Sequence, residues 1–209
     1  MEEKKGLRVG FVGDSILYGW AVAPEAACWR VFQELAGMNV VCDGDVNPLA
    51  LPGGTLPDLV TRTPRLVARY GPQLVFVCAG ANHYDGDGTL SWPYGMTEAE
   101  LFRLFYRLFA DLTHAGCKVV WLGLPPFEAC GTDQEIPRNL SQRIAGFCAD
   151  QIWDSCYVTD CMMRDPSWNA GGGRFYDNLA MDIHPNTAGQ VCIAECCAAW
   201  LRQQNGLSW

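Results

Sequence analysis

The sequence predicts an α/β fold built around a parallel β-sheet. Short apolar runs alternate with longer segments of helical periodicity along the whole 209-residue chain, which is the pattern of repeating βα units. Hydrophobic residues make up 49% of the chain and charged residues 18%, a composition typical of globular rather than disordered proteins. We expect one domain over residues 1–209, with five strands and about five helices.

Strand and helix signals alternate through the first half of the chain. An apolar run at residues 7–12 predicts the first strand, and apolar residues at helical spacing over 24–36 predict the first helix. Residues 39–42 predict a short second strand, and residues 56–69 a second helix. The run 74–79 is continuously apolar and is followed by a glycine. We therefore expect a central parallel strand that is buried on both faces.

The second half of the chain continues the same alternation. Thr97 and Glu100 have the spacing of a capping box, which marks a helix start. The elements expected after it are a helix over 101–114, a strand over 117–124, a helix over 137–152, a strand over 156–159 and a helix over 187–203. Residues 85–96 and 166–177 are too long for minimal connections and are expected to form loops that carry the ligand site.

The charge balance argues against two classes of partner. Lysine and arginine number 15 against 23 acidic residues, which gives a net charge of −8. A chain this acidic offers no basic surface for nucleic acid or for an anionic membrane. No apolar stretch has the length of a spanning helix, and the charged start leads directly into the first strand. We expect a cytoplasmic protein without stable membrane insertion, and its oligomeric state stays open.

The 11 cysteines are expected to be reduced and non-catalytic. Many of them lie inside apolar runs, such as residues 77–79 and 194–199, and a disulfide framework is typical of short secreted chains instead. The chain contains no Cys-x-x-Cys pair, no His-Glu-x-x-His motif and only three histidines. The sequence therefore predicts neither a metal site nor a cofactor.

A serine and a histidine, far apart in the chain, are candidates for a catalytic pair. Ser15 follows the first strand in Gly13-Asp14-Ser15, where a turn would expose a nucleophile. His184 precedes the last helix and lies in a loop. A serine hydroxyl needs an imidazole to take its proton, and the ends of parallel strands bring distant residues together. The alternatives are that Ser15 is a turn residue and that His184 caps the last helix.

Two further segments can supply donors for an oxyanion. Gly53 and Gly54 precede the second helix, where a glycine N–H can approach a ligand closely, and the choice between them stays open. Asn82 follows the central strand and carries a donor amide. Each segment alone is more typical of an ordinary turn.

In this order, the four segments resemble the SGNH (GDSL-type) hydrolases, a family of esterases and lipases. Ser15 matches the family's nucleophile, Gly53 its block II glycine, Asn82 its block III asparagine and His184 its block V histidine. The resemblance implies a three-layer α/β/α, flavodoxin-like fold with a five-stranded parallel sheet. It also implies an oxyanion hole formed by the N–H groups of Ser15 and Gly53 and the side-chain amide of Asn82.

The chain departs from the family pattern near its histidines. The residue three before His184 is usually aspartate and is Met181 here. Asp182 is the preferred partner for the imidazole, with Asp177 or a backbone carbonyl as alternatives. His83 stands where the family commonly has aspartate, and we expect it to be structural and bonded to a loop carbonyl.

These features predict an esterase that forms an acyl-enzyme on Ser15 and needs no cofactor. The substrate class stays open between acetylated carbohydrate, lipid, thioester and small aryl ester, so lysophospholipase or thioesterase activity is an alternative. A non-catalytic binding module with the same fold is a further alternative, prompted by Met181. A flavodoxin-like nucleotide binder is disfavoured, because Asp14 stands where a phosphate-binding loop would lie.

Overall fold

Five parallel strands form one sheet in the computed structural model, which describes residues 6–85, 89–90, 96–127, 130, 133–168, 172–177 and 183–204. Their order across the sheet is β2-β1-β3-β4-β5, and every neighbouring pair is parallel. The strands are β1 (Arg8–Gly13), β2 (Asn39–Val40), β3 (Leu74–Cys78), β4 (Lys118–Trp121) and β5 (Asp154–Ser155). This arrangement confirms the predicted fold class.

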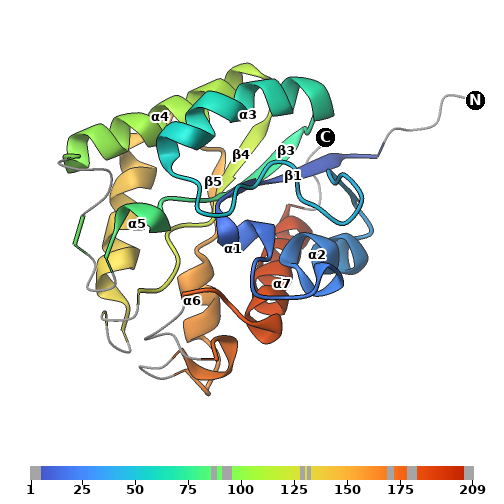
Figure 1. The fold of residues 1–209 in the computed structure, drawn as a ribbon, viewed down its shortest axis with the longest axis vertical. Coiled ribbons are helices and arrows are strands. Elements are labelled where there is room, and N and C mark those ends of the chain that lie inside the picture. The colour runs from blue at the N-terminus through green and yellow to red at the C-terminus, as the bar shows by residue number, and fades with distance from the viewer. Residues whose placement is uncertain are drawn as a thin grey trace, which may run out of the picture.

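Helices cover both faces of the sheet. Figure 1 shows α3 and α4 side by side over one face, with α2 and α7 against the other. The α-helices are α1 (Ser15–Tyr18), α2 (Cys28–Ala36), α3 (Leu56–Tyr70), α4 (Glu98–His114), α5 (Glu135–Phe147), α6 (Val158–Met163) and α7 (Thr187–Gln203). Short 3₁₀ turns are formed by Pro24–Ala26, Ala81–His83 and Gly173–Phe175.

Strand β3 shows why the central strands are continuously apolar. Successive side chains of a strand point to opposite faces. Phe76 and Cys78 accordingly pack with the α2 and α7 side of the core, whereas Val75 and Val77 pack with the α3 and α4 side. All four side chains are fully buried. A strand covered on both faces must be apolar at every position, as predicted.

The helix signals were accurate where caps or periodicity were strong. The predicted capping box holds the start of α4: the Glu100 N–H donates to Thr97 Oγ1 over 3.3 Å, and the Thr97 N–H donates back to Glu100 Oε2 over 2.7 Å. Helix α7 has the predicted bounds.

The fifth strand begins before the predicted range of 156–159. It lies at Asp154–Ser155, and residues expected to be strand belong to helix α6. Val158 and Met162, four residues apart on α6, are both buried. The apolar residues here therefore follow a helical spacing, and the edge strand itself is only 2 residues long.

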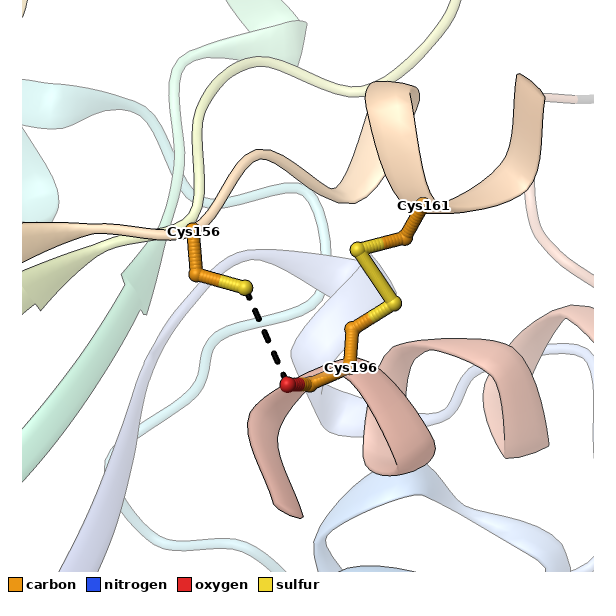
Figure 2. Close-up of a disulfide and its surroundings, with 3 residues drawn as sticks. All are labelled: Cys156, Cys161 and Cys196. Atoms are coloured by element: carbon orange, nitrogen blue, oxygen red, sulfur yellow. Dashed lines mark hydrogen bonds between the residues drawn. A yellow bond between two sulfur atoms is a disulfide. The ribbon is translucent and has the colours of Figure 1, made fainter. Parts of the chain in front are cut away.

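The prediction that all cysteines are free was wrong for one pair. Cys161 of α6 and Cys196 of α7 form a disulfide, with Cα atoms 6.2 Å apart (Figure 2). Eight further cysteines carry free thiols: Cys28, Cys42, Cys78, Cys117, Cys148, Cys156, Cys192 and Cys197. The crossing of two helices brings Cys161 and Cys196 together, and periodicity along the chain does not show such a crossing.

Membrane-spanning helices and metal sites were both unexpected from the sequence. Within the residues that the structure describes, no helix has the length and apolar character to span a membrane. The same described ranges contain no group of three or more His, Cys, Asp or Glu side chains arranged to hold a metal ion.

Candidate active site

Ser15 is held at the end of β1 by tight backbone packing. A Cβ atom at Gly13 would collide with the carbonyl oxygen of Cys78, so only glycine allows β1 and β3 to approach this closely. Asp14 then caps helix α1, because its Oδ1 accepts the Ile16 N–H over 3.1 Å. Ser15 is the first residue of that helix and is only 6% exposed.

His184 meets Ser15 across 169 residues of sequence. Its Nε2 lies 2.9 Å from Ser15 Oγ. This distance is within the range expected between a serine nucleophile and the imidazole that takes its proton. The structure therefore brings together the two residues that the sequence proposed as a catalytic pair.

The residues around His184 are fixed by the side chain of Asn186. Asn186 Nδ2 donates to the carbonyl oxygen of Arg174 over 3.1 Å and to Asp177 Oδ1 over 2.9 Å. The Asn186 N–H donates to the carbonyl oxygen of Phe175 over 2.9 Å. The same side chain also caps α7. One polar residue thus anchors the approach to α7 on the chain around Phe175.

The partner of the second imidazole nitrogen stays a prediction. Asp182, the preferred acceptor, lies outside the residues that the structure describes. Asp177 is exposed, and its Oδ1 accepts the hydrogen bond from Asn186.

The predicted oxyanion donors lie on neighbouring loops. Asn82 Nδ2 donates to the carbonyl oxygen of Gly54 over 2.9 Å, which joins the loop after β3 to the loop before α3. The Gly54 N–H is already used in a turn, where it donates to Leu51 over 2.8 Å. Gly53 has a φ of 68°, a conformation that favours glycine. Its N–H has no acceptor within the described part of the chain.

His83 has a structural role at the start of α3. The imidazole is fully buried, and its Nε2 accepts the N–H of Leu56 over 2.9 Å. The expected bond from the imidazole to a loop carbonyl stays a prediction. The first N–H groups of a helix have no partner inside the helix, so an imidazole acceptor completes the start of α3.

Asp14 is a charged group that the sequence argument did not place in the site. The side chain is fully buried, and its Oδ2 has no hydrogen-bond partner among the described residues. Burial raises the pKa of Asp14 to about 6, against opposing effects from the Ile16 N–H and from positive charge on His184. The signal in the sequence was an acid directly beside the nucleophile.

The aromatic residues near the site divide into different roles. Trp20 is 57% exposed, and its backbone N–H donates to the carbonyl oxygen of Ser15 over 3.1 Å. Tyr84 lines a pocket of about 360 Å³ next to α5. Tyr176 is buried. Trp92 and Tyr94, which belong to the loop over 85–96 that was expected to carry the ligand site, lie outside the described residues.

Comparison with known proteins identifies one family and many similar structures. The profile of the GDSL-like Lipase/Acylhydrolase family matches residues 11–191. No curated protein matches the sequence.

Three solved structures illustrate the likeness in fold. A catalytic mutant of an acetylxylan esterase from Geobacillus stearothermophilus has 17% identity and a TM-score of 0.68, with 100% of this chain and 98% of that chain covered. The lipase/acylhydrolase from Enterococcus faecalis has 20% identity and a TM-score of 0.65, with 95% and 96% covered. The psychrotrophic esterase EstA from Pseudoalteromonas sp., inhibited by monoethylphosphonate, has 14% identity and a TM-score of 0.64, with 94% and 97% covered. At these identities the likeness shows the shared fold.

Proposed function

Because the chain belongs to the GDSL-like lipase/acylhydrolase family and is an ester hydrolase, we propose that it cleaves a carboxylic ester through an acyl-enzyme on Ser15. The observation that carries this proposal is the 2.9 Å distance between Ser15 Oγ and His184 Nε2. A hydroxyl paired with an imidazole in this way becomes a nucleophile.

In the proposed reaction, His184 takes the proton of Ser15 as the hydroxyl oxygen attacks the ester carbonyl. The resulting imidazolium then donates that proton to the leaving alcohol, which departs and leaves the acyl group on Ser15. In the second half, His184 takes a proton from water, which attacks the acyl-enzyme and releases the acid. Asp182 accepts the N–H of the other imidazole nitrogen in this proposal and stabilises the imidazolium.

The negative charge that develops on the carbonyl oxygen needs fixed donors. We assign this role to the N–H groups of Ser15 and Gly53 and to the side-chain amide of Asn82. Gly53 is preferred to Gly54, whose N–H is held by Leu51. The Asn82 amide has two hydrogens, and its bond to Gly54 uses one of them. That bond also fixes the orientation of the amide before substrate arrives.

The substrate we propose is a small acyl ester or an acetylated carbohydrate, which places the partner among small molecules and glycans. Trp20 is exposed, and its backbone N–H bonds to the carbonyl oxygen of Ser15; in this proposal its ring supplies a face for a sugar or an acyl chain. A lipid acyl group, as in lysophospholipase or thioesterase activity, is the second candidate. The pocket beside Tyr84 supports it, because a chain of several carbons can lie along its apolar side chains. Leu90, Ile136 and Leu140 line this pocket together with the polar Glu98, Asn139 and Arg143.

A chain-length series of p-nitrophenyl esters, together with acetylated xylan, tests this function. We expect turnover by the wild-type protein and by Ser155→Ala, a control that alters a serine on β5, outside the site. Turnover by Ser15→Ala should fall to the background rate. A wild-type protein that binds acylated ligands without hydrolysing them would instead be a binding module. The preferred chain length then separates the two substrate classes.

A further inference from the structure

A groove separate from Ser15 and His184 lies between helices α6 and α7. Its volume is about 890 Å³, and its lining includes Cys156, Cys161, Cys192 and Cys196. We call it the thiol groove. Cys161 and Cys196 are both partly exposed and form the disulfide in Figure 2. A small thiol in solution can therefore reach this bond, whereas a disulfide in the core would be shielded.

The disulfide joins the two helices between which the segment that carries His184 lies in the sequence. We call residues 164–186 the histidine segment; the structure describes 164–168, 172–177 and 183–186 of it. The segment leaves α6 and enters α7, and the bond between Cys161 and Cys196 joins these two helices. Cys161 is two residues before the end of α6, and Cys196 lies nine residues after the start of α7. The cross-link thus holds the end of α6 against the middle of α7.

A continuous series of contacts leads from the disulfide to His184. Met162, next to Cys161, is buried, and its Sδ accepts the hydroxyl of buried Tyr176 over 3.6 Å. The neighbouring carbonyl of Phe175 accepts the Asn186 N–H over 2.9 Å. Asn186 lies two residues after His184 in the sequence. Movement of α6 relative to α7 would therefore be transmitted to the imidazole through packed groups.

We propose that the Cys161–Cys196 disulfide is a reversible redox clamp on the histidine segment, opened by a small dithiol that enters the thiol groove. The effect of this clamp on hydrolysis rests on the proposed function. When the clamp is closed, the imidazole stays within reach of Ser15. When it opens, α6 and α7 are held only by packing, the contacts that lead from Met162 to Asn186 loosen and the catalytic pair is less often aligned.

The exchange balances in atoms and electrons. A thiolate of the dithiol attacks one cysteine sulfur and releases the other as a thiolate, which gives a mixed disulfide. The second thiol of the reductant then attacks the sulfur that the reductant contributes to the mixed disulfide. This step releases the remaining cysteine. Two protein thiols and one oxidised dithiol result, so two electrons and two protons pass to the protein. An oxidised dithiol closes the clamp by the reverse steps.

Cys156 is a poor candidate for opening the bond from inside the protein. Its thiol points toward α7 in Figure 2, and its Sγ donates to the carbonyl oxygen of Cys196 over 3.8 Å. Burial raises the pKa of the Cys156 thiol to about 11. Because the thiolate is the attacking form, a thiol of this kind reacts slowly at neutral pH. The attacking group therefore comes from solution.

The test compares oxidised and dithiothreitol-reduced wild-type protein by two independent measurements. Trypsin reports on the histidine segment directly, because Arg164 and Arg174 are exposed residues within it. We expect reduction to increase cleavage at these sites by at least about fivefold, since local opening governs cutting. We expect kcat to fall by roughly three- to tenfold, because a displacement of 1 Å at a reacting group can cost about 100-fold.

Two variants serve as matched controls. Cys161→Ser/Cys196→Ser should resemble the reduced wild-type protein in either redox state. Cys42→Ser, which removes a partly exposed free thiol elsewhere, should respond to reduction as the wild-type protein does. The proposal is overturned if mass spectrometry finds no Cys161–Cys196 bond in the oxidised protein, or if reduction changes neither measurement. Absence of esterase activity in the oxidised protein contradicts the proposed function, and trypsin cleavage then decides on the clamp alone.

Discussion

The two members of the catalytic pair are held in different ways. Ser15 follows β1, which pairs with β3 along its length from Val9 to Gly13, and the Leu51 N–H donates to the carbonyl oxygen of Gly13 over 2.9 Å. His184 lies outside the sheet and depends on side-chain contacts such as those of Asn186. The nucleophile is therefore positioned by the core, whereas the base is positioned by groups that can be changed without altering the sheet.

This difference predicts which substitutions affect mainly catalysis and which also affect stability. A change near Ser15 disturbs close backbone packing, as the collision at Gly13 shows. A change around His184 removes one polar contact from a partly exposed segment. Substitutions near the histidine should therefore alter kcat with a small effect on folding, and the following predictions test that expectation.

The largest effect is expected at Asp182. Asp182→Asn should lower kcat by on the order of 10²–10⁴ with little change in melting temperature, because the imidazole loses the acceptor that fixes its tautomer. Steady-state kinetics and thermal denaturation measure the two quantities. Asp177→Asn is the matched control and should have the smaller effect. A near-normal rate for Asp182→Asn would make a Ser15–His184 dyad the better description.

On the nucleophile side of the site, Asn82 is the residue to test. Asn82→Ala should lower kcat by on the order of 10²–10³, because one preorganised donor is lost from the transition state. KM should change much less than kcat. The bond from Asn82 to Gly54 is also lost, so a small decrease in melting temperature is expected. An unchanged kcat would leave Asn82 with a structural role alone.

The buried carboxyl of Asp14 should make the stability of the folded protein depend on pH. Burial raises its pKa from 3.8 to about 6 in the folded protein. Below about pH 3 both states are protonated and the shift has no effect; as the pH rises toward 7, the folded state loses about 3 kcal/mol relative to the unfolded state. Asp14→Asn retains the cap and removes this loss.

Urea unfolding at pH 4.5 and pH 7.5 measures the effect at Asp14. The Asp14→Asn variant should gain stability relative to the wild-type protein as the pH rises. The difference between their free energies of unfolding should therefore be larger at pH 7.5 than at pH 4.5. An equal difference at both pH values would mean that the buried carboxyl does not titrate in this range.

The smallest effect is expected at Asn186, whose side chain contributes to both stability and catalysis. Asn186→Ala removes the cap of α7 and should cost about 1 kcal/mol of stability. Because Asn186 also anchors the approach to His184, kcat should fall by about tenfold, which corresponds to about 1.4 kcal/mol.

A cap on the opposite side of the sheet supplies the control for Asn186. Thr97→Ala removes the cap of α4 and should cause a similar loss of stability. Its kcat should remain that of the wild-type protein. If both variants lost activity equally, the effect at Asn186 would reflect general destabilisation rather than the position of the imidazole.

Local signals explain how much of the fold could be predicted. The apolar run of β3, the capping box of α4 and the periodicity of α7 depend on residues close together in sequence, and each is confirmed. Strand β5 was misplaced because a 2-residue edge strand has too short a pattern to separate from the helix after it.

The site was predicted to the extent that strand ends bring residues together. Ser15 and His184 follow from that rule and from the family resemblance. The disulfide, the partner of His83 and the buried charge of Asp14 depend on how separate elements pack. Cys161 and Cys196, for instance, are 35 residues apart and meet only because α6 lies against α7. Periodicity does not show such contacts.

The identity of the nucleophile is tested most directly by covalent labelling. A fluorophosphonate reacts with an activated serine and loses fluoride, which leaves a phosphonylated residue that mass spectrometry can locate. We predict a single adduct on Ser15, in the tryptic peptide 9–30, no labelling of Ser15→Ala, and slow labelling of His184→Ala. An adduct on another serine, or equal labelling of Ser15→Ala, would contradict the assignment of Ser15 as the nucleophile.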